Sequence, residues 1–356
     1  LMVGYGGARR DYAALKFLLF SLAGGLIMLA SVIGLYGVSA AKGAPSYLLS
    51  DLAKLDLNND LGKWLMAGFL IAFVIKAPMV PLHTWLPDAA EQSTPGTATM
   101  LVGILDKIGT FGMIKFCLGI FPDASRWAAP VMMVLALVSI IWGALGAIGS
   151  RNLMRLVAYT SISHFGFMVL GIYAMTTTSI AGSAFYMLNH GFSTAALFLV
   201  VGYLITRSGT ADIDAFGGAQ KLVPVFSGVF LLAWLSALGL PGMSSFVSEF
   251  MVLAGTFGRE PAFAAVAAIG VILSAVYALR VYRSVMTGPV SDASASQFTG
   301  RDLTGLERAI MVPIIGVLLV LGFYPAPAVT LVQSTAVTAM QRVAVADPAP
   351  VVEGVK

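Results

Sequence analysis

The feature that most constrains the fold of this chain is a series of apolar runs, each about 20 residues long. A helix of that length spans the roughly 30 Å hydrocarbon core of a bilayer. Only helices and closed barrels satisfy all their backbone polar groups inside lipid, and no alternating strand pattern is present. The sequence therefore predicts an all-α, polytopic bundle of about nine transmembrane helices. The expected spans lie near residues 12–40, 61–80, 97–120, 128–149, 156–175, 178–206, 222–258, 261–283 and 309–334.

Composition supports a membrane protein and excludes several other classes. The chain is 58% hydrophobic and 11% charged, whereas soluble domains carry roughly 25% charged residues. Its net charge of +4 comes from basic residues between apolar runs, which is typical of anchors at lipid headgroups and not of nucleic-acid binding. The single Cys117 excludes an internal disulfide, and no His/Cys cluster has metal-ligand spacing. We therefore expect neither metal-binding nor cofactor-binding residues in this chain.

The distribution of charge also gives an orientation. Basic residues between the spans are more frequent on the side that holds Leu1, which predicts a cytoplasmic start and a C-terminus outside. The polar stretch 287–305 is expected to form a cytoplasmic connection, and residues 341–356 a frayed tail. The stretch 4–10 reads as a loop after a further helix, so we expect the chain to be truncated at its start.

One span contains a lysine directly before two prolines. Lys76 ends the apolar run 69–75, and Pro78 and Pro81 follow. Each proline removes a backbone donor and clashes with the preceding turn, so the helix should break just after Lys76. A cation at the centre of a membrane helix costs about 2.5 to 3.5 kcal/mol, which favours a functional role.

A second span is interrupted in a similar way. Pro241 and Gly242 break the span 222–258, and Glu249 follows two turns later. Two broken helices that each carry a charge are typical of transporters built from repeats, with their site near the bilayer midplane. A simple packing kink is the alternative.

Five ionisable residues are expected at similar depth. From the helical rise, Lys76 lies about 18 Å and Lys107 about 15 Å into their spans. His164 and His190 lie about 12 and 18 Å in, and Glu249 lies about 14 Å from the end of its span. Each alone could be a satisfied core residue. Together they predict a lateral chain of proton sites.

Asp106 is a further intramembrane acid whose role stays open at this point. It precedes Lys107 directly, and sequence neighbours do not share a helix face. It either pairs elsewhere or tunes Lys107.

Three motifs carry a resemblance to a known family. They are Lys76–Ala89 (KAPMVPLHTWLPDA), Arg155–Phe167 (RLVAYTSISHFGF) and Leu238–Gly242 with Ser248–Phe250 (LGLPG and SEF). The chain resembles the antiporter-like membrane subunits of respiratory complex I and of multisubunit cation/proton antiporters. Glu249 is typical of the M type of these subunits, whereas related subunits usually carry lysine there.

The resemblance implies an architecture. The family fold has fourteen helices with two inverted five-helix repeats, of which this chain would supply the last nine helices. Residues 1–120 would end the first repeat, 121–285 would form the second, and 286–356 would hold the connection, a last helix and the tail. The family's essential glutamate would lie on a helix that precedes this chain.

The resemblance also implies a function and roles for the five residues. Lys76 would be the central lysine of the first half-channel and Lys107 the connecting lysine. His164 and His190 would link it to Glu249, the exit-side group. The chain would belong to a proton-translocating membrane subunit of a bacterial NADH:quinone oxidoreductase.

Redox chemistry would take place in partner subunits that hold NADH, FMN, iron–sulfur clusters and quinone. Other membrane-arm subunits, including two antiporter-like paralogues, and the bilayer of the inner membrane would be its partners. The alternatives are a subunit of a sodium/proton antiporter, a membrane subunit of a related hydrogenase and an inactive scaffold.

Overall fold

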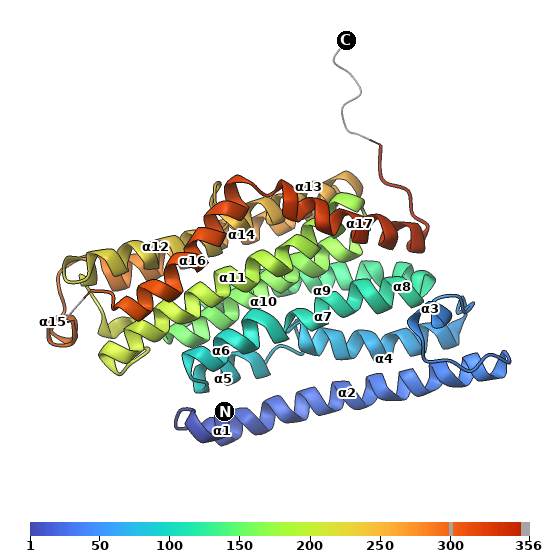
Figure 1. Ribbon diagram of the computed structural model, residues 1–356, viewed down its shortest axis with the longest axis horizontal. Helices are drawn as coiled ribbons and strands as arrows, with labels where there is room; N and C mark the ends of the chain where they lie inside the picture. Colours follow the sequence, from blue (N-terminus) through green and yellow to red (C-terminus); the bar gives the residue numbers. More distant parts are fainter. Residues whose placement is uncertain (299–301, 350–356) are drawn as a thin grey trace, which may run out of the picture.

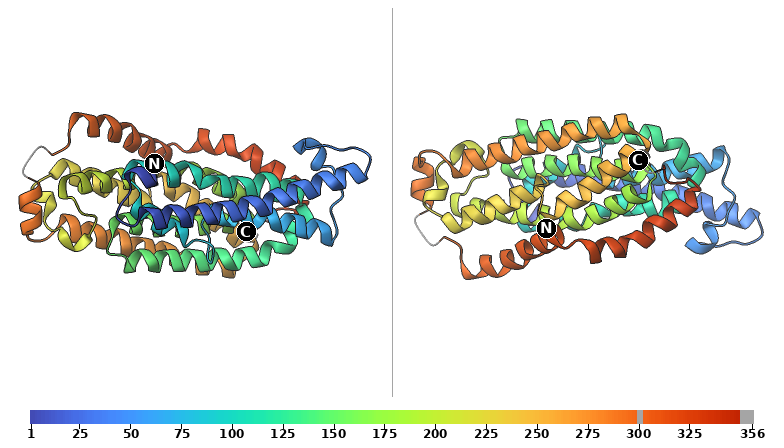
Figure 2. Two further views of the ribbon diagram at one scale, coloured as in Figure 1. Left: turned by 90° about the horizontal axis from the view of Figure 1, so that it is seen from below. Right: turned by 90° about the horizontal axis from the view of Figure 1, so that it is seen from above.

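The computed structural model describes residues 1–298 and 302–349 of the chain. Its helices run roughly parallel to the long axis of the molecule and pack side by side (Figures 1 and 2). Within the described residues there is no β-strand, and an isolated bridge joins Asn152 and Asp212. The predicted all-α class is confirmed.

The helices are numbered in chain order, with η marking π and 3-10 segments. Their bounds are α1 (Met2–Tyr5), α2 (Arg10–Ala41), α3 (Leu49–Leu52), α4 (Asp60–Lys76), α5 (Trp85–Gln92), α6 (Pro95–Met100), η1 (Leu101–Leu105), α7 (Lys107–Gly112), η2 (Met113–Cys117), α8 (Leu118–Ile120), α9 (Pro122–Gly149), α10 (Leu153–Tyr173), α11 (Thr177–Ser208), η3 (Ile213–Ala215), η4 (Ala219–Lys221), α12 (Pro224–Ala237), α13 (Ser244–Arg259), α14 (Pro261–Met286), α15 (Asp292–Gln297), α16 (Gly305–Phe323) and α17 (Ala326–Val343).

Six of the helices in the described ranges are long and apolar enough to cross a membrane: α2, α9, α10, α11, α14 and α16. The other three expected spans, near 61–80, 97–120 and 222–258, contain shorter helical pieces. In α10, 94% of the apolar stretch is buried, against 17% in α2 and in α16. Helix α10 is therefore at the centre of the bundle, and α2 and α16 are at its rim (Figures 1 and 2).

Small residues let the central helices approach closely. A Cβ atom on Gly143 of α9 would lie 2.5 Å from the backbone nitrogen of Ser163 on α10. A Cβ atom on Gly166 of α10 would lie 2.7 Å from the carbonyl oxygen of Ala136 on α9. Inside lipid, helices associate through such close backbone packing because burial against a neighbour removes little water.

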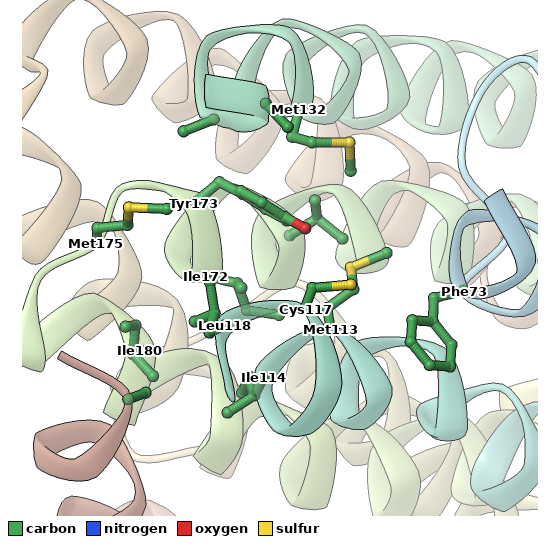
Figure 3. Packing of buried hydrophobic residues seen from close by; sticks show 14 of the residues in the cluster. Phe73, Met113, Ile114, Cys117, Leu118, Met132, Ile172, Tyr173, Met175 and Ile180 are labelled. Atoms are coloured by element: carbon green, nitrogen blue, oxygen red, sulfur yellow. The ribbon is translucent and has the colours of Figure 1, made fainter. Parts of the chain in front are cut away.

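Apolar side chains fill one end of the bundle where η2 and α8 meet α9 and α10. Figure 3 shows Cys117 and Met113 facing Met132 and Tyr173 in this cluster. Cys117 is buried, and its carbonyl oxygen accepts a hydrogen bond from the hydroxyl of Ser125. The same carbonyl oxygen also accepts the backbone N–H of Phe121 at 3.1 Å, so two donors hold the end of α8.

The first broken span has its interruption directly after Lys76, where α4 ends, and Pro78 lies within the turn that follows. The indole nitrogen of Trp85, the first residue of α5, donates to the carbonyl oxygen of Ile75 at 2.9 Å. The backbone nitrogen of Val80 donates to a serine hydroxyl on α9 at 3.0 Å. Side chains thus satisfy backbone groups that the break frees, as non-helical backbone within a membrane requires.

The second broken span is interrupted between α12 and α13. Gly239 and Gly242 adopt left-handed backbone angles, with φ of 71° and 92°, and Pro241 lies between them. Glycine takes these angles without steric cost, which explains the residue types in this turn. The side-chain amide of Asn189 on α11 donates to the carbonyl oxygen of Ser244 at 2.8 Å and fixes the start of α13.

The structure corrects the expectation for the last span, 309–334. Helix α16 ends at Phe323, and a separate helix, α17, begins at Ala326 and continues to Val343. The cause is Pro325, which cannot continue α16 and stands at the start of α17. Gly322 packs against the backbone of Gly242, so this break meets the α12–α13 break.

The same finding shortens the expected frayed tail, because residues 341–343 are helical. Of that tail, residues 350–356 lie outside the described residues.

Candidate functional site

Lys107 lies between three helices at the start of α7. Its ammonium nitrogen donates to the carbonyl oxygen of Val102 at 2.5 Å and lies 2.7 Å from Nδ1 of His190 on α11. It also lies 5.4 Å from the centre of the Phe165 ring on α10. The preceding segment η1 is a π-helix, a distortion that is frequent at functional sites. The lysine is thus in direct contact with a titratable ring on another helix.

The two predicted histidines lie next to each other. The ring centres of His190 and His164 are 5.2 Å apart, and the rings meet edge to face. Both side chains are buried. Nε2 of His190 lies 3.1 Å from the hydroxyl of Thr194, and Nε2 of His164 lies 3.3 Å from that of Tyr277 on α14. A neutral imidazole has one donor and one acceptor nitrogen, so each ring can accept a proton on one side and release one on the other.

Glu249 lies on α13, two turns after the second break, and is 4% exposed. Its Oε1 atom accepts a hydrogen bond from the hydroxyl of Tyr186 on α11 at 3.3 Å. Gly239 leaves the space for the other oxygen, because a Cβ atom there would collide with Oε2. A cavity of about 270 Å³ adjoins Glu249 and is also lined by Pro241 and Phe250. The carboxylate therefore has a protein partner on one side and open volume on the other.

Tyr186 joins the histidines to the carboxylate. Its ring centre lies 5.9 Å from that of His164 and 6.4 Å from that of His190. The side chains thus form a continuous row from Lys107 on α7, through α11 and α10, to Glu249 on α13. In Figure 1, α10 and α11 lie in the middle of the bundle, with α7 below them and α13 along the upper edge.

Lys76 is set apart from this row. Its ammonium nitrogen donates to the hydroxyl of Ser21 on α2 at 3.1 Å and lies 5.4 Å from the centre of the Phe17 ring. Within the described residues, no hydrogen bond joins Lys76 to Lys107 or to either histidine. The structure thus brings together four of the five residues that the sequence singles out.

Comparison with known proteins identifies the family of this chain. Residues 1–275 match the transmembrane family described as NADH:quinone oxidoreductase/Mrp antiporter. The chain belongs to this family.

Relatives with curated names point to one branch of the antiporter family. The chain is 46% identical over 357 residues to NADH-quinone oxidoreductase subunit M of Mycobacterium tuberculosis, covering 98% of this chain and 64% of the relative. It is 36% identical over 335 residues to subunit M of Rhodobacter capsulatus, covering 91% of this chain and 65% of the relative. The chain therefore spans slightly less than two thirds of the length of these relatives.

Solved structures show the same fold. A chain of respiratory complex I from Thermus thermophilus is 32% identical and superposes with a TM-score of 0.88, over 95% of this chain and 71% of that one. A chain of the Mrp complex from Dietzia sp. DQ12-45-1b is 23% identical, with a TM-score of 0.85 over 96% of this chain and 71% of that one. At that identity the second likeness concerns the fold alone.

One end of this antiporter-family bundle carries a network of charges. Asp88 on α5 accepts hydrogen bonds from Lys16 of α2 and from Arg155 of α10, both at 2.7 Å, and Arg155 also pairs with Glu91 at 3.0 Å. Burial acts to raise the pKa of Asp88, but the hydrogen bonds from the two cations outweigh it and hold that pKa below its ordinary value. The network connects three helices that are distant in sequence.

Two tyrosines of this site, Tyr186 in the row and Tyr277 beside it, escaped the sequence analysis. Tyr186 lies one helical turn before His190, and that spacing on one face could have identified it. Tyr277 lies on α14 and has no such signal, because its partner His164 is 113 residues away in sequence.

Among the described residues, no three His, Cys, Asp or Glu side chains lie close enough together to hold a metal ion.

Proposed function

We propose that this chain is part of a proton-translocating membrane subunit of NADH:quinone oxidoreductase. Protons move sideways through the bundle along the row that begins at Lys107 and ends at Glu249. The observation that carries the proposal is the unbroken contact of titratable side chains across four helices, with separations of 2.7 Å for Lys107–His190 and 3.3 Å for Tyr186–Glu249.

The surroundings of the row fit proton transfer. His190, His164 and Tyr186 are buried, so protons on them are shielded from bulk water. Transfer between such groups needs donor and acceptor within about 2.6–3.2 Å or joined by one water. The ring centre of His164 lies 5.2 Å from that of His190 and 5.9 Å from that of Tyr186, and the Tyr186 hydroxyl lies 3.3 Å from Glu249. These transfers therefore require small side-chain movements or a bridging water. The cavity beside Glu249 is otherwise lined by apolar residues, so Glu249 is the one titratable group that faces it.

The arrangement of helices supports the division into repeats. A long helix followed by a broken helix and a further helix occurs twice, as α2, α4–α5 and residues 95–120, and as α11, α12–α13 and α14. Helix α2 runs away from the end that holds Leu1, whereas α11 runs back towards it (Figure 1). We assign residues 1–120 to the first repeat, 121–285 to its inverted counterpart and 286–356 to the connection, last helix and tail.

The proposal includes partners and a location. NADH, FMN, iron–sulfur clusters and quinone belong to other subunits, and two antiporter-like paralogues are among the membrane-arm neighbours. The subunit lies in the bacterial inner membrane with its C-terminus outside, since basic residues between the spans favour the opposite side. The names of the relatives at 36–46% identity support the oxidoreductase over a sodium/proton antiporter.

The proposal is tested with Glu249→Gln and Lys107→Met in inverted membrane vesicles that contain the assembled complex. Each variant removes one titratable group from the row, so NADH-driven proton uptake should fall about tenfold or more. Oxidation of NADH by an artificial electron acceptor should be unchanged, because the redox centres lie elsewhere. Glu260→Gln, at the end of the bundle, serves as the matched control. An unaltered ratio of protons to electrons together with an unaltered quinone-reductase rate in both variants would refute the proposal.

A further inference from the structure

Asp106 is a buried acid that the row described above does not use. It lies between η1 and α7, its side chain is fully buried, and neither carboxylate oxygen has a hydrogen-bond partner among the described residues. Buried polar groups are nearly always hydrogen-bonded, and an isolated buried carboxylate costs several kcal/mol. The presence of an unpaired carboxylate at this buried position therefore needs a physical explanation.

Packing places Asp106 beside the first broken helix. Gly109 follows one turn after Asp106 and so shares its helix face. A Cβ atom on Gly109 would lie 2.5 Å from the backbone nitrogen of Ala77 and 2.6 Å from the carbonyl oxygen of Phe73. Because Ala77 directly follows Lys76, this contact brings the face that carries Asp106 against the end of α4.

Two lysines interact with the charge of Asp106 without hydrogen-bonding to it. The charges of Lys107 and Lys76 both act on Asp106, while their ammonium groups donate to Val102 and to Ser21 instead. Asp106 is thus within electrostatic range both of Lys76, on the broken helix, and of Lys107, in the row. A carboxylate with no fixed partner is free to turn towards either amine or to bind water between them.

We propose that Asp106 carries protons between Lys76 and Lys107 and so connects the broken helix α4 to the row. This inference rests on the proposed function. In the transfer, an N–H bond of the Lys76 ammonium breaks and an O–H bond forms on Asp106, which leaves a neutral amine. That O–H bond then breaks, and the proton binds the neutral amine of Lys107. No electrons change hands, and water between the groups passes on one proton for each that it accepts.

The test compares Asp106→Asn with Asp106→Glu in the same vesicles. Asparagine matches aspartate in shape but cannot carry the proton, so NADH-driven proton uptake should fall about tenfold. Glutamate keeps the carboxyl group and should restore at least half of the lost uptake. Thr110→Val is the matched control, because Thr110 is buried one turn further along α7 and its hydroxyl bonds a backbone carbonyl oxygen of that helix. It should pump like the parent.

Glu249→Gln is measured in parallel to separate this inference from the proposed function. If Glu249→Gln impairs uptake and Asp106→Asn does not, the role of Asp106 is refuted while the row stands. If Asp106→Glu is as defective as Asp106→Asn in fully assembled complexes, the role is refuted as well, because the defect then follows side-chain size and not the loss of a proton site. If neither Glu249→Gln nor Asp106→Asn has an effect, both proposals are wrong.

Discussion

The hydroxyl of Tyr186 connects the buried carboxylate of Glu249 to the two histidines. It donates to Glu249 at 3.3 Å, and its ring lies against both histidines. This separation is longer than the roughly 2.5–3.0 Å of most O–H···O bonds, but few competing donors are present inside the bundle. The tyrosine therefore both holds the carboxylate in place and occupies the only step of the row at which an O–H group meets an oxygen.

The substitution Tyr186→Phe should lower coupled proton uptake about tenfold. It removes the hydroxyl and keeps the ring, and a buried acceptor that loses its donor costs about 1–3 kcal/mol. The measurement is NADH-driven proton uptake in membrane vesicles. Tyr282→Phe is the control, because the hydroxyl of Tyr282 lies near Ser227 and outside the row. Equal uptake in the two variants would show that the Tyr186 hydroxyl plays no part.

At this scale, sequence reasoning singled out residues whose type is costly in lipid. Lys107, His164, His190 and Glu249 stand out because charged or titratable groups are rare in apolar runs. Tyr186 did not stand out, since tyrosine is common in membrane proteins and its partner on α13 is 63 positions away. The isolation of Lys76 from the row could not be predicted, because depth along a helix says nothing about which way a side chain points.

At the scale of elements, the stretch 95–120 is the most irregular part of the bundle. It alternates between α-helical and π-helical turns, and Gly109 in its middle packs against the end of α4. Composition does not signal π-helical turns, so the sequence predicted a regular helix there. The breaks after Lys76 and at Pro241 were predictable, since proline and glycine dictate local backbone geometry.

Replacing Gly109 with alanine should lower the stability of the assembled complex by about 1–3 kcal/mol, because the new methyl group collides with backbone atoms of α4. Thermal denaturation of the complex in detergent, followed by native electrophoresis, measures the change. Gly119→Ala is the matched control on the same stretch, because a Cβ atom there meets nothing within 4 Å. If both variants melt at the parent temperature, the packing argument fails.

At the scale of the whole molecule, the network around Asp88 joins helices from both proposed repeats. Lys16 and Arg155 are 72 and 67 positions from Asp88 in sequence. No local pattern predicts pairs at such separations, although all of the residues were visible as loop or span-end charges. The network therefore depends on the complete fold and in turn restrains it.

Asp88→Asn should destabilise the complex by about 1–2 kcal/mol at neutral pH, because it leaves two partly buried cations without their shared carboxylate. Since the pKa of Asp88 is held below its ordinary value, its contribution is complete above about pH 4 and is lost as the pH falls through the lowered pKa. The difference in melting temperature between parent and variant should thus stay constant from about pH 8 to pH 5 and shrink only in stronger acid.

Asp60→Asn provides the control for that experiment. Asp60 pairs with Lys63 within one turn of α4, and its side chain is 88% exposed. Exposed pairs contribute little, so this variant should melt like the parent at every pH. A pH-dependent loss for Asp60→Asn equal to that for Asp88→Asn would contradict the assignment.

The contact between Gly322 and Gly242 couples the rim of the bundle to its interior. Because these two backbones touch, α13 cannot swing relative to α12 without displacing the end of α16. The next residue, Phe323, is 76% exposed. A fluorescent or spin label at this outward-facing position would therefore register a hinge movement that begins beside Glu249, deep within the fold.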